Sequence, residues 1–391
     1  MEKMIILGRI IRNNLLSIAI FLVVTRAFIE INLLYYLFPI LCATLIFFSI
    51  KYFKGLNKNL IYVSLFPLYC LLSSIWSLDS YWSLKRSIYL IIIFLGLLVL
   101  LIVYNQSKDF FKSFLPANLF ILGLSLFSLI FQIPADRWTG GNSMGFKGFS
   151  LHQNTLASLI VFTLPGLFFI LQKSNKKSYS NLLFISLMLI NIFILLITYS
   201  RASILAFSIT LLFYILLKDF SYLKYILTGI LFIVFLYFLP SKFHDTINTL
   251  ALKNGNNIFD RRLELWEASF KAAKLGGLFG LGYGISSPQI NISQGNFRDD
   301  GKYIREKGNS ILGLIEEVGI VGFLFFITPL LLIIKNFILL YKKKENLLII
   351  ATILGMIIHA QFEAWWVGPG SVQYPLYLTY TNYLIFNNTI S

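Results

Sequence analysis

The sequence predicts an all-α bundle of about twelve transmembrane helices with one large loop outside the cytoplasm. Three observations lead to this fold class. Only 13% of the residues are charged, whereas soluble domains carry about a quarter. Apolar windows of roughly 20 residues, enough to cross about 30 Å of hydrocarbon, recur along almost the whole chain. One long hydrophilic segment, 241–309, interrupts them.

The apolar windows divide the chain into three parts. Residues 1–240 are expected to hold nine transmembrane helices, centred near residues 20, 41, 67, 95, 124, 163, 189, 209 and 231. Residues 241–309 form the loop, and residues 310–391 hold three more helices, centred near residues 322, 354 and 381. The net charge of +16 does not indicate nucleic acid, because the basic residues lie in short tracts between apolar segments.

The distribution of basic residues predicts the orientation. If both termini are cytoplasmic, seventeen Lys and Arg residues fall on the cytoplasmic side and six in the short loops opposite, namely Arg26, Lys85, Arg86, Arg137, Lys147 and Arg201. The loop 241–309 then lies outside the cytoplasm. Within it, Leu263, Trp266, Phe270 and Ala273 recur at helical spacing, which predicts a short amphipathic helix on the outer membrane interface.

Arg201 is the one charged residue between Asn181 and Leu217. As a single helix this stretch would be about 55 Å long at 1.5 Å per residue, so it must contain two spans joined by a tight turn. The predicted topology puts that turn, "TYSRAS", at the outer surface. Arg201 then has two possible roles there, since it can snorkel to lipid phosphates or bind an anion in a cavity between helices.

Arg261 and Arg262 open the predicted loop helix, where their charge opposes the positive end of the helix dipole. A phosphate group would relieve this conflict, because helix N-termini and arginine side chains both bind phosphate. The neighbouring Asp260 and Glu264 offer an alternative explanation, since they can neutralise the pair.

Further charged residues lie near or inside the last three spans. Glu316 and Glu317 fall inside the tenth span, where an ionised carboxylate needs a partner, and an arginine is expected. His359 and Glu363 lie four residues apart at the outer end of the eleventh span. They form either part of a site or an interfacial hydrogen bond below the Trp365–Trp366 pair.

Common cofactor and metal motifs are not found in the sequence. There is no phosphate-binding glycine loop, dinucleotide fingerprint, HExxH or paired-cysteine motif. The three histidines, His152, His244 and His359, lie in different segments without ligand spacing. Neither a cofactor nor a metal ion is therefore expected.

Four motifs in order resemble one family. "GFKGFSLHQNTLAS", "TYSRAS", "RLELW" followed by "GLFGLGYG", and "NSILGLIEEVGIVG" are similar to segments of the O-antigen ligase and O-antigen polymerase superfamily. The resemblance covers roughly residues 140–340. It implies a glycan transferase in the bacterial inner membrane, with its active site facing the periplasm and an undecaprenyl diphosphate-linked glycan as donor. The acceptor is lipid A core in ligases and another carrier-linked repeat unit in polymerases.

The resemblance also assigns residues. The family's two essential arginines match Arg201 and Arg262, and its acidic residue before Gly-x-x-Gly matches Glu317. His152, Asn154, Asn309, Ser310 and Arg261 are the candidate substrate-binding residues. Ligases carry a histidine directly before Asn-Ser, where this chain has Gly308. This departure favours a polymerase over a ligase.

The expected reaction is an inverting, metal-independent displacement at the anomeric carbon. Arg201 and Arg262 would stabilise the charge on the diphosphate leaving group. Glu317, Glu363 or His359 would serve as general base for the acceptor hydroxyl. The alternative from another class is a transporter of a lipid-linked sugar or solute, although internal repeats and mid-membrane helix breaks, typical of such proteins, are not evident.

Overall fold

The computed structural model describes residues 2–28, 32–49, 58–101, 110–139, 145–173, 179–218, 260–290, 295–297, 303–305, 307–368 and 370–386. The helices of the first half are α1 (Glu2–Thr25), α2 (Asn32–Ser49), α3 (Lys58–Leu72), α4 (Ser80–Val99), α5 (Leu115–Phe131), α6 (Gln153–Lys173), α7 (Tyr179–Ile197) and α8 (Arg201–Lys218). The later helices are α11 (Asp260–Gly276), α12 (Ser310–Lys335), α13 (Phe337–Tyr341), α14 (Lys344–His359) and α15 (Gln373–Phe386).

Short elements connect these helices. Three 3₁₀ turns are η2 (Ser73–Ile75), η4 (Phe110–Phe114) and η7 (Trp365–Val367). Two antiparallel strand pairs join β1 (Trp138–Thr139) to β2 (Gly145–Phe146) and β3 (Gly295–Phe297) to β4 (Tyr303–Arg305). The fold is therefore all-α, as the sequence predicts.

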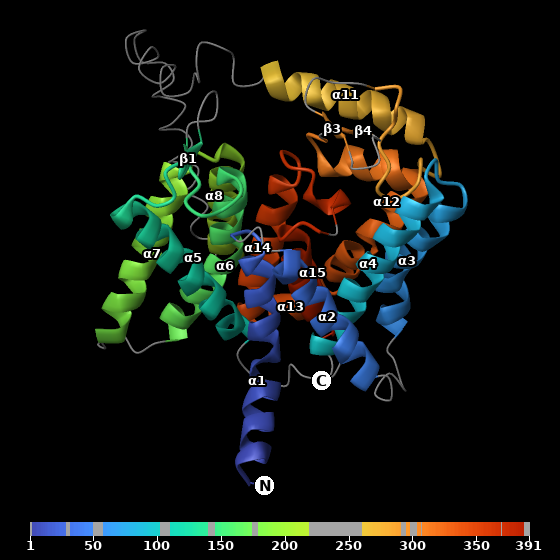
Figure 1. The fold of residues 1–391 in the computed structure, drawn as a ribbon. Coiled ribbons are helices and arrows are strands. Elements are labelled where there is room, and N and C mark those ends of the chain that lie inside the picture. The colour runs from blue at the N-terminus through green and yellow to red at the C-terminus, as the bar shows by residue number, and fades with distance from the viewer. Residues whose placement is uncertain are drawn as a thin grey trace, which may run out of the picture.

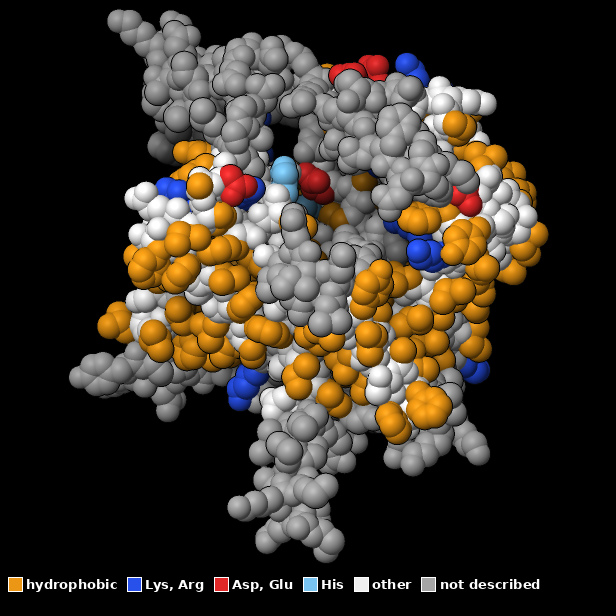
Figure 2. Space-filling view, viewed as in Figure 1, with side chains coloured by type: hydrophobic (Ala, Val, Ile, Leu, Met, Phe, Trp, Pro, Cys, Tyr) orange, Lys and Arg blue, Asp and Glu red, His pale blue; other side chains and the backbone are white. Residues whose placement is uncertain are grey.

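The predicted spans agree with the described helices. Eleven of the twelve predicted centres fall inside them, and the twelfth, near residue 231, lies outside the described residues. Within the described ranges, six helices are long and apolar enough to cross a membrane, and three shorter helices are also apolar. Figure 2 shows a broad belt of hydrophobic side chains across the visible face of the bundle, with charged side chains above and below it. The chain is a multi-pass membrane protein.

The bundle is organised around α15. Every residue of this helix is buried, which is typical of a helix surrounded by others on all sides. It contacts α4, α6, α12 and α14. Around it α14 packs on α8, α12 on α3, and α2 on α4. Figure 1 shows α11 lying across one end of the bundle, while the N-terminal end of α1 lies at the opposite end.

Helix α12 is broken at Gly319, whose φ of 68° is not helical. The segment 277–282 runs beside the break and completes its backbone hydrogen bonds. Ile320 N–H donates to Gly277 O at 3.1 Å, and Gly282 N–H donates to the carbonyl oxygen of Glu317 at 2.9 Å. Because backbone groups freed by a helix break must be satisfied within a membrane protein, the "GLFGLGYG" segment is part of the structure of this span.

Helix α11 forms where the sequence predicts it and packs on α12. Its buried face consists mainly of small residues, namely Leu265, Ala268, Ser269, Ala272, Ala273 and Gly276. Of the predicted apolar stripe, Leu263 and Phe270 are exposed, and Trp266 is half-buried. A Cβ at Gly276 would collide with the backbone of α12. Small side chains therefore bring the two helices close together, which periodicity alone does not predict.

Candidate active site

The segment 359–367, from the end of α14 through η7, contacts the first turns of three other helices. It binds α12 through Ser310, whose N–H donates to Ala360 O at 2.9 Å and whose hydroxyl donates to the carbonyl oxygen of Glu363 at 2.7 Å. The same hydroxyl accepts from Trp366 N–H at 3.3 Å. Ser310, predicted from sequence to bind substrate, thus holds the segment against α12.

Asn309 has a similar structural role. Its Oδ1 caps α12 by accepting from Leu312 N–H at 3.0 Å. Its Nδ2 donates to both the backbone oxygen and the side-chain oxygen of Gln361, each at 3.2 Å. The Asn-Ser pair therefore fixes the N-terminus of α12 on the 359–367 segment.

Glu363 lies half-buried in this segment and faces α6. Its Oε1 accepts a hydrogen bond from Asn154 Nδ2 at 2.7 Å. The N–H of Asn154 donates to Nδ1 of His152, which is exposed at the head of α6. The structure thus brings together His152, Asn154 and Glu363, which the sequence analysis assigned separately.

Arg201 is the first residue of α8, and its side chain is exposed. The predicted tight turn is confirmed, since α7 ends at Ile197 and α8 starts at Arg201. Two residues further on, Ser203 Oγ lies 3.1 Å from His359 Nε2. This contact joins the start of α8 to the same 359–367 segment.

The helices α6, α8 and α12 therefore all begin next to residues 359–363. The first N–H groups of a helix lack partners within it, and the helix dipole adds partial positive charge there. At α12 and α6 some of these N–H groups already have partners, since Ser310 N–H donates to Ala360 O, Leu312 N–H to Asn309 Oδ1 and Asn154 N–H to His152 Nδ1. The partial positive charge of the three helix ends and the exposed Arg201 favour an anionic group such as phosphate nearby. The half-buried carboxylate of Glu363 lies within this environment.

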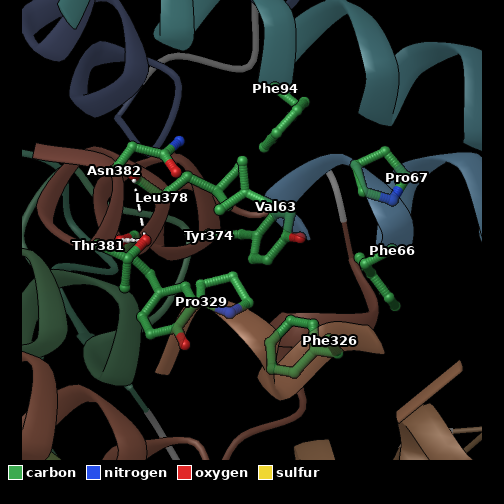
Figure 3. Close-up of a pocket in the computed structure, with 11 residues that line it drawn as sticks. Val63, Phe66, Pro67, Phe94, Phe326, Pro329, Tyr374, Leu378, Thr381 and Asn382 are labelled. Atoms are coloured by element: carbon green, nitrogen blue, oxygen red, sulfur yellow. Dashed lines mark hydrogen bonds between the residues drawn. The ribbon is translucent and has the colours of Figure 1, made fainter. Parts of the chain in front are cut away.

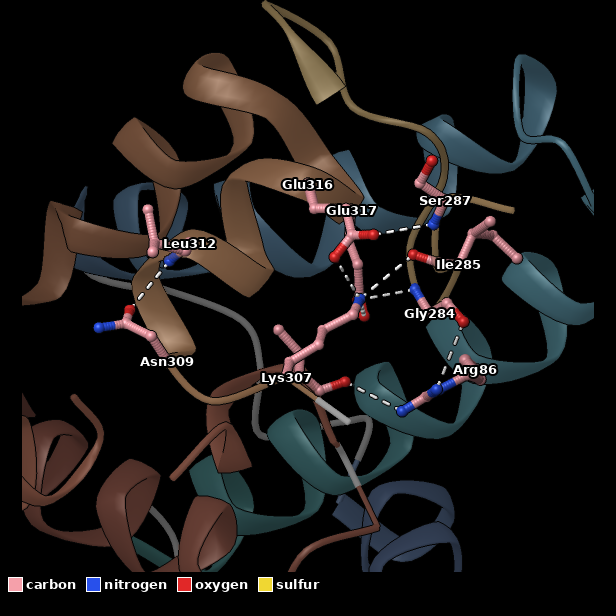
Figure 4. Close-up of polar contacts among 10 residues, drawn as sticks. Arg86, Gly284, Ile285, Ser287, Lys307, Asn309, Leu312, Glu316 and Glu317 are labelled. Atoms are coloured by element: carbon pink, nitrogen blue, oxygen red, sulfur yellow. Dashed lines mark hydrogen bonds and ion pairs between the residues drawn. The ribbon is translucent and has the colours of Figure 1, made fainter. Parts of the chain in front are cut away.

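Glu316 and Glu317 lie in a second, buried cluster (Figure 4). The cation between them is Lys307 rather than the expected arginine. Its Nζ lies 2.5 Å from Glu317 Oε1 and 3.4 Å from Glu316 Oε2. The remaining carboxylate oxygens accept from backbone N–H groups, Gly284 on Glu317 at 2.7 Å and Ser287 on Glu316 at 2.8 Å. The carboxylates thus hold Gly284, the last residue of "GLFGLGYG", and Ser287 of the following loop against α12.

Arg86 extends this cluster from α4. Its guanidinium donates to Val367 O at 2.9 Å and to Gly284 O at 3.5 Å. Figure 4 shows the Arg86 side chain pointing toward Gly284. Arg86 therefore connects the loop held by Glu317 to the end of η7. It links the buried cluster to the 359–367 segment.

The other two predicted arginines, Arg261 and Arg262, lie in the first turn of α11. Their side chains are outside the described residues, as is His244. The expected convergence of Arg201 and Arg262 therefore stays a prediction. Within the described part of the chain, no three His, Cys, Asp or Glu side chains are grouped so that they could hold a metal ion.

A pocket lies deeper in the bundle, lined by α3, α4, α12 and α15 (Figure 3). Its walls are mainly apolar and aromatic, and its lining includes no carboxylate, imidazole, lysine or arginine. The Tyr377 hydroxyl and Asn382 Nδ2 are buried at this pocket, and neither has a hydrogen-bond partner among the described residues. Such a lining suits water or an apolar chain rather than acid–base chemistry.

Sequence reasoning missed Lys307, Ser203 and Gln361 as parts of these clusters, and it treated Trp365 only as an interfacial aromatic. Lys307 lies two residues before the Asn-Ser pair, in a segment without helical or strand periodicity. The signal in the sequence is the intramembrane carboxylate pair itself, which requires a compensating cation, and Lys307 lies ten residues before Glu317.

The fold and these clusters define a multi-pass membrane protein with a polar site at one end of its bundle. Residues 183–327 match the family model described as O-antigen ligase. The match includes Arg201, Arg262 and Glu317 and confirms the predicted resemblance to the O-antigen ligase and polymerase superfamily. A comparison with curated proteins finds no match. The match supports, at the level of the family, a glycan transferase of the O-antigen ligase or polymerase type, and that family implies a lipid-linked glycan and an acceptor in a membrane as substrates.

Proposed function

We propose that the protein is a polymerase of a surface glycan, which transfers an undecaprenyl diphosphate-linked glycan onto a hydroxyl of another carrier-linked repeat unit. The observation that carries this proposal is the meeting of three helix N-termini, Arg201 and Glu363 around residues 359–363. This arrangement combines an anion-binding environment, which can stabilise the leaving diphosphate, with a carboxylate, which can accept the proton of the acceptor hydroxyl.

The environment of Gly308 supports a polymerase over a ligase. Gly308 is buried, and a Cβ there would lie 2.8 Å from the Cβ of Leu265 on α11. The backbone oxygen of Gly308 also accepts a hydrogen bond from Trp266 Nε1 at 3.2 Å. A side chain at position 308 would therefore require Leu265 on α11 to shift. The description of the family model favours the second candidate, a ligase that transfers the glycan to lipid A core.

In the proposed reaction, the acceptor oxygen attacks the anomeric carbon and forms the new glycosidic bond while the bond to the diphosphate oxygen breaks. The configuration at that carbon is inverted, and no metal takes part. Arg201 and Arg262 stabilise the negative charge on the departing undecaprenyl diphosphate. The acceptor hydroxyl releases its proton to a carboxylate of the protein, and the leaving diphosphate ultimately accepts it.

Glu363 is the proposed general base. Among the three candidates, Glu317 is buried and bonded to Lys307 and Gly284, so proton uptake there would disrupt a buried ion pair. The two ring nitrogens of His359 both lie in buried hydrogen bonds. Glu363 is half-buried, and its contact with the amide of Asn154 orients the carboxylate.

We place the protein in a bacterial inner membrane, with both termini cytoplasmic and the site facing the periplasm. The charge asymmetry of the loops supports this orientation. The position of α11, at the end of the bundle opposite the N-terminus, is compatible with it (Figure 1). Residues 1–240 and 310–391 would then form the membrane bundle, with 241–309 as the periplasmic segment.

A deletion strain of the source bacterium tests the proposal. Loss of a polymerase leaves single repeat units on the acceptor, whereas loss of a ligase leaves long chains on the lipid carrier. A gel ladder of the surface glycan distinguishes these outcomes. Strand transfer by the purified protein in detergent, where no compartments exist, excludes transport as the sole activity. An unchanged ladder in the deletion strain would contradict the proposed function.

A further inference from the structure

His359 is a fully buried histidine at the junction of α14 and the 359–367 segment, with an exposure of 0%. Its Nδ1 lies 3.1 Å from Nε1 of Trp365, and its Nε2 lies 3.1 Å from Oγ of Ser203. The ring of Phe162 packs against the imidazole with the centroids 5.5 Å apart. The imidazole thus bridges the 359–367 segment and the start of α8.

The chemistry of these neighbours determines the tautomer. An indole N–H can only donate a hydrogen bond, so Nδ1 of His359 must be the acceptor for Trp365. A neutral imidazole then carries its hydrogen on Nε2, which donates to Ser203 Oγ. Protonation of the ring would add a hydrogen at Nδ1, where the Trp365 N–H already points, and would create a buried charge. The contacts therefore favour the neutral ring.

Ser203, the partner of His359 Nε2, belongs to the 198–203 turn, which also contains Arg201. Thr198, Ser200 and Ser203 are buried, whereas the side chains of Tyr199 and Arg201 are exposed. The hydroxyl of Ser200 donates to Ser203 Oγ at 3.0 Å, and Ser200 N–H donates to Thr198 Oγ1 at 3.2 Å. The turn thus contacts the imidazole through the hydroxyl of Ser203, while the side chain of Arg201 is exposed.

We propose that His359 is a positioning residue, which holds the 198–203 turn as a neutral hydrogen-bond donor so that Arg201 faces the diphosphate. It does not accept the proton of the acceptor hydroxyl. The inference rests on the proposed function, because it presumes that Arg201 binds the diphosphate of the donor.

Two substitutions at His359 separate positioning from proton transfer. In His359→Gln, the side-chain oxygen can accept from Trp365 and the amide N–H can donate to Ser203, but the amide does not titrate. In His359→Leu, both hydrogen bonds are lost at similar volume. Ser203→Ala removes the same contact with a smaller change, which keeps the test informative if His359→Leu does not fold.

Binding of radiolabelled undecaprenyl diphosphate to the full-length protein in detergent is the first readout, and the gel ladder of a complemented deletion strain is the second. We expect His359→Gln to bind and polymerise within about threefold of the wild type. His359→Leu and Ser203→Ala should bind about fivefold to tenfold more weakly, the range expected for one or two lost hydrogen bonds.

Other outcomes overturn the inference. If His359→Gln binds normally but makes no polymer, His359 is a proton acceptor. Normal binding by both His359→Leu and Ser203→Ala would mean that the contact does not position Arg201. Arg201→Ala, measured alongside, tests the proposed function separately, since normal binding and full polymer in that variant would remove the basis of both proposals.

Discussion

The two acidic clusters of this protein differ in burial and in hydrogen-bond partners, although both lie where α12 meets other segments. Glu317 is buried at 2% exposure, with one oxygen on Lys307 and the other on the N–H of Gly284. Glu363 is half-buried and accepts from the neutral amide of Asn154. The first carboxylate is fully buried with a lysine, whereas the second is half-buried and lies beside the first turns of α6 and α12.

From this difference we infer a structural role for Glu317, the acidic residue of the family motif. A buried ion pair is costly to disrupt, because removing one partner leaves an uncompensated charge. Such a pair suits a structural contact. We call the contact that Glu316, Glu317 and Lys307 make between the 280–287 loop and the broken helix α12 the clasp. A partly hydrated carboxylate can change protonation at lower cost, which suits a general base.

The largest effect is expected from Glu363→Gln, which keeps the size of the side chain but cannot accept the acceptor's proton. Transfer should fall by about 10²-fold to 10⁴-fold, the usual contribution of a general base, with little change in the melting temperature in detergent. Glu317→Gln is the matched variant and should mainly lower the melting temperature. Full polymer from Glu363→Gln, or a Glu317→Gln protein that is inactive yet as stable as the wild type, would reverse the two assignments.

Arg201→Ala should reduce transfer by about 10²-fold to 10³-fold, comparable to the loss of one group that stabilises transition-state charge. Arg201→Lys should fall between this variant and the wild type, since lysine keeps the charge but lacks the planar fork that grips two phosphate oxygens. Arg137→Ala, in another predicted outer loop, is the control and should behave like the wild type. Equal activity of Arg201→Ala and Arg137→Ala would rule out a role for Arg201 at the site.

The variant Lys307→Met tests the structural role of the buried cluster through the stability of the protein. Leaving Glu316 and Glu317 without their cation should destabilise the protein by about 3–5 kcal/mol, seen as a lower melting temperature in detergent. Lys271 is exposed on α11, so Lys271→Met should change stability by less than about 0.5 kcal/mol. If Lys307→Met and Lys271→Met have the same melting temperature, the buried cluster does not act as a clasp.

The sequence predicts the membrane fold well because the bilayer imposes simple rules on it. Apolar windows must span a known thickness, and the unbroken run around Arg201 had to contain a turn on grounds of length alone. The small-residue face of α11 and the break at Gly319 could not be predicted this way. Both depend on a close approach between segments that are not neighbours in sequence, and hydrophobic periodicity does not report such contacts.

In the candidate site, too, the sequence predicts some features and not others. Asn154, Ser310 and Glu363 can each be selected from sequence by residue type or by resemblance, and the structure brings them together. Their separate roles could not be predicted, because they follow from partners far along the chain. Only the fold shows that Ser310 binds the backbone of Glu363, or that Lys307 lies between two carboxylates.

The smallest effects are expected where the clasped loop meets α12. Gly277 has a φ of 55° with no atom within 4 Å of a built Cβ, so Gly277→Ala should cost only the strain of a left-handed residue, about 1–2 kcal/mol. Gly319 has a similar φ of 68°, but its Cβ would also collide with the carbonyl oxygen of Leu278. Gly319→Ala should therefore cost more than Gly277→Ala in the same melting experiment. Equal losses would mean that the 277–282 segment does not lie against the break in α12, and the clasp formed by Glu316 and Glu317 would then have no loop to hold.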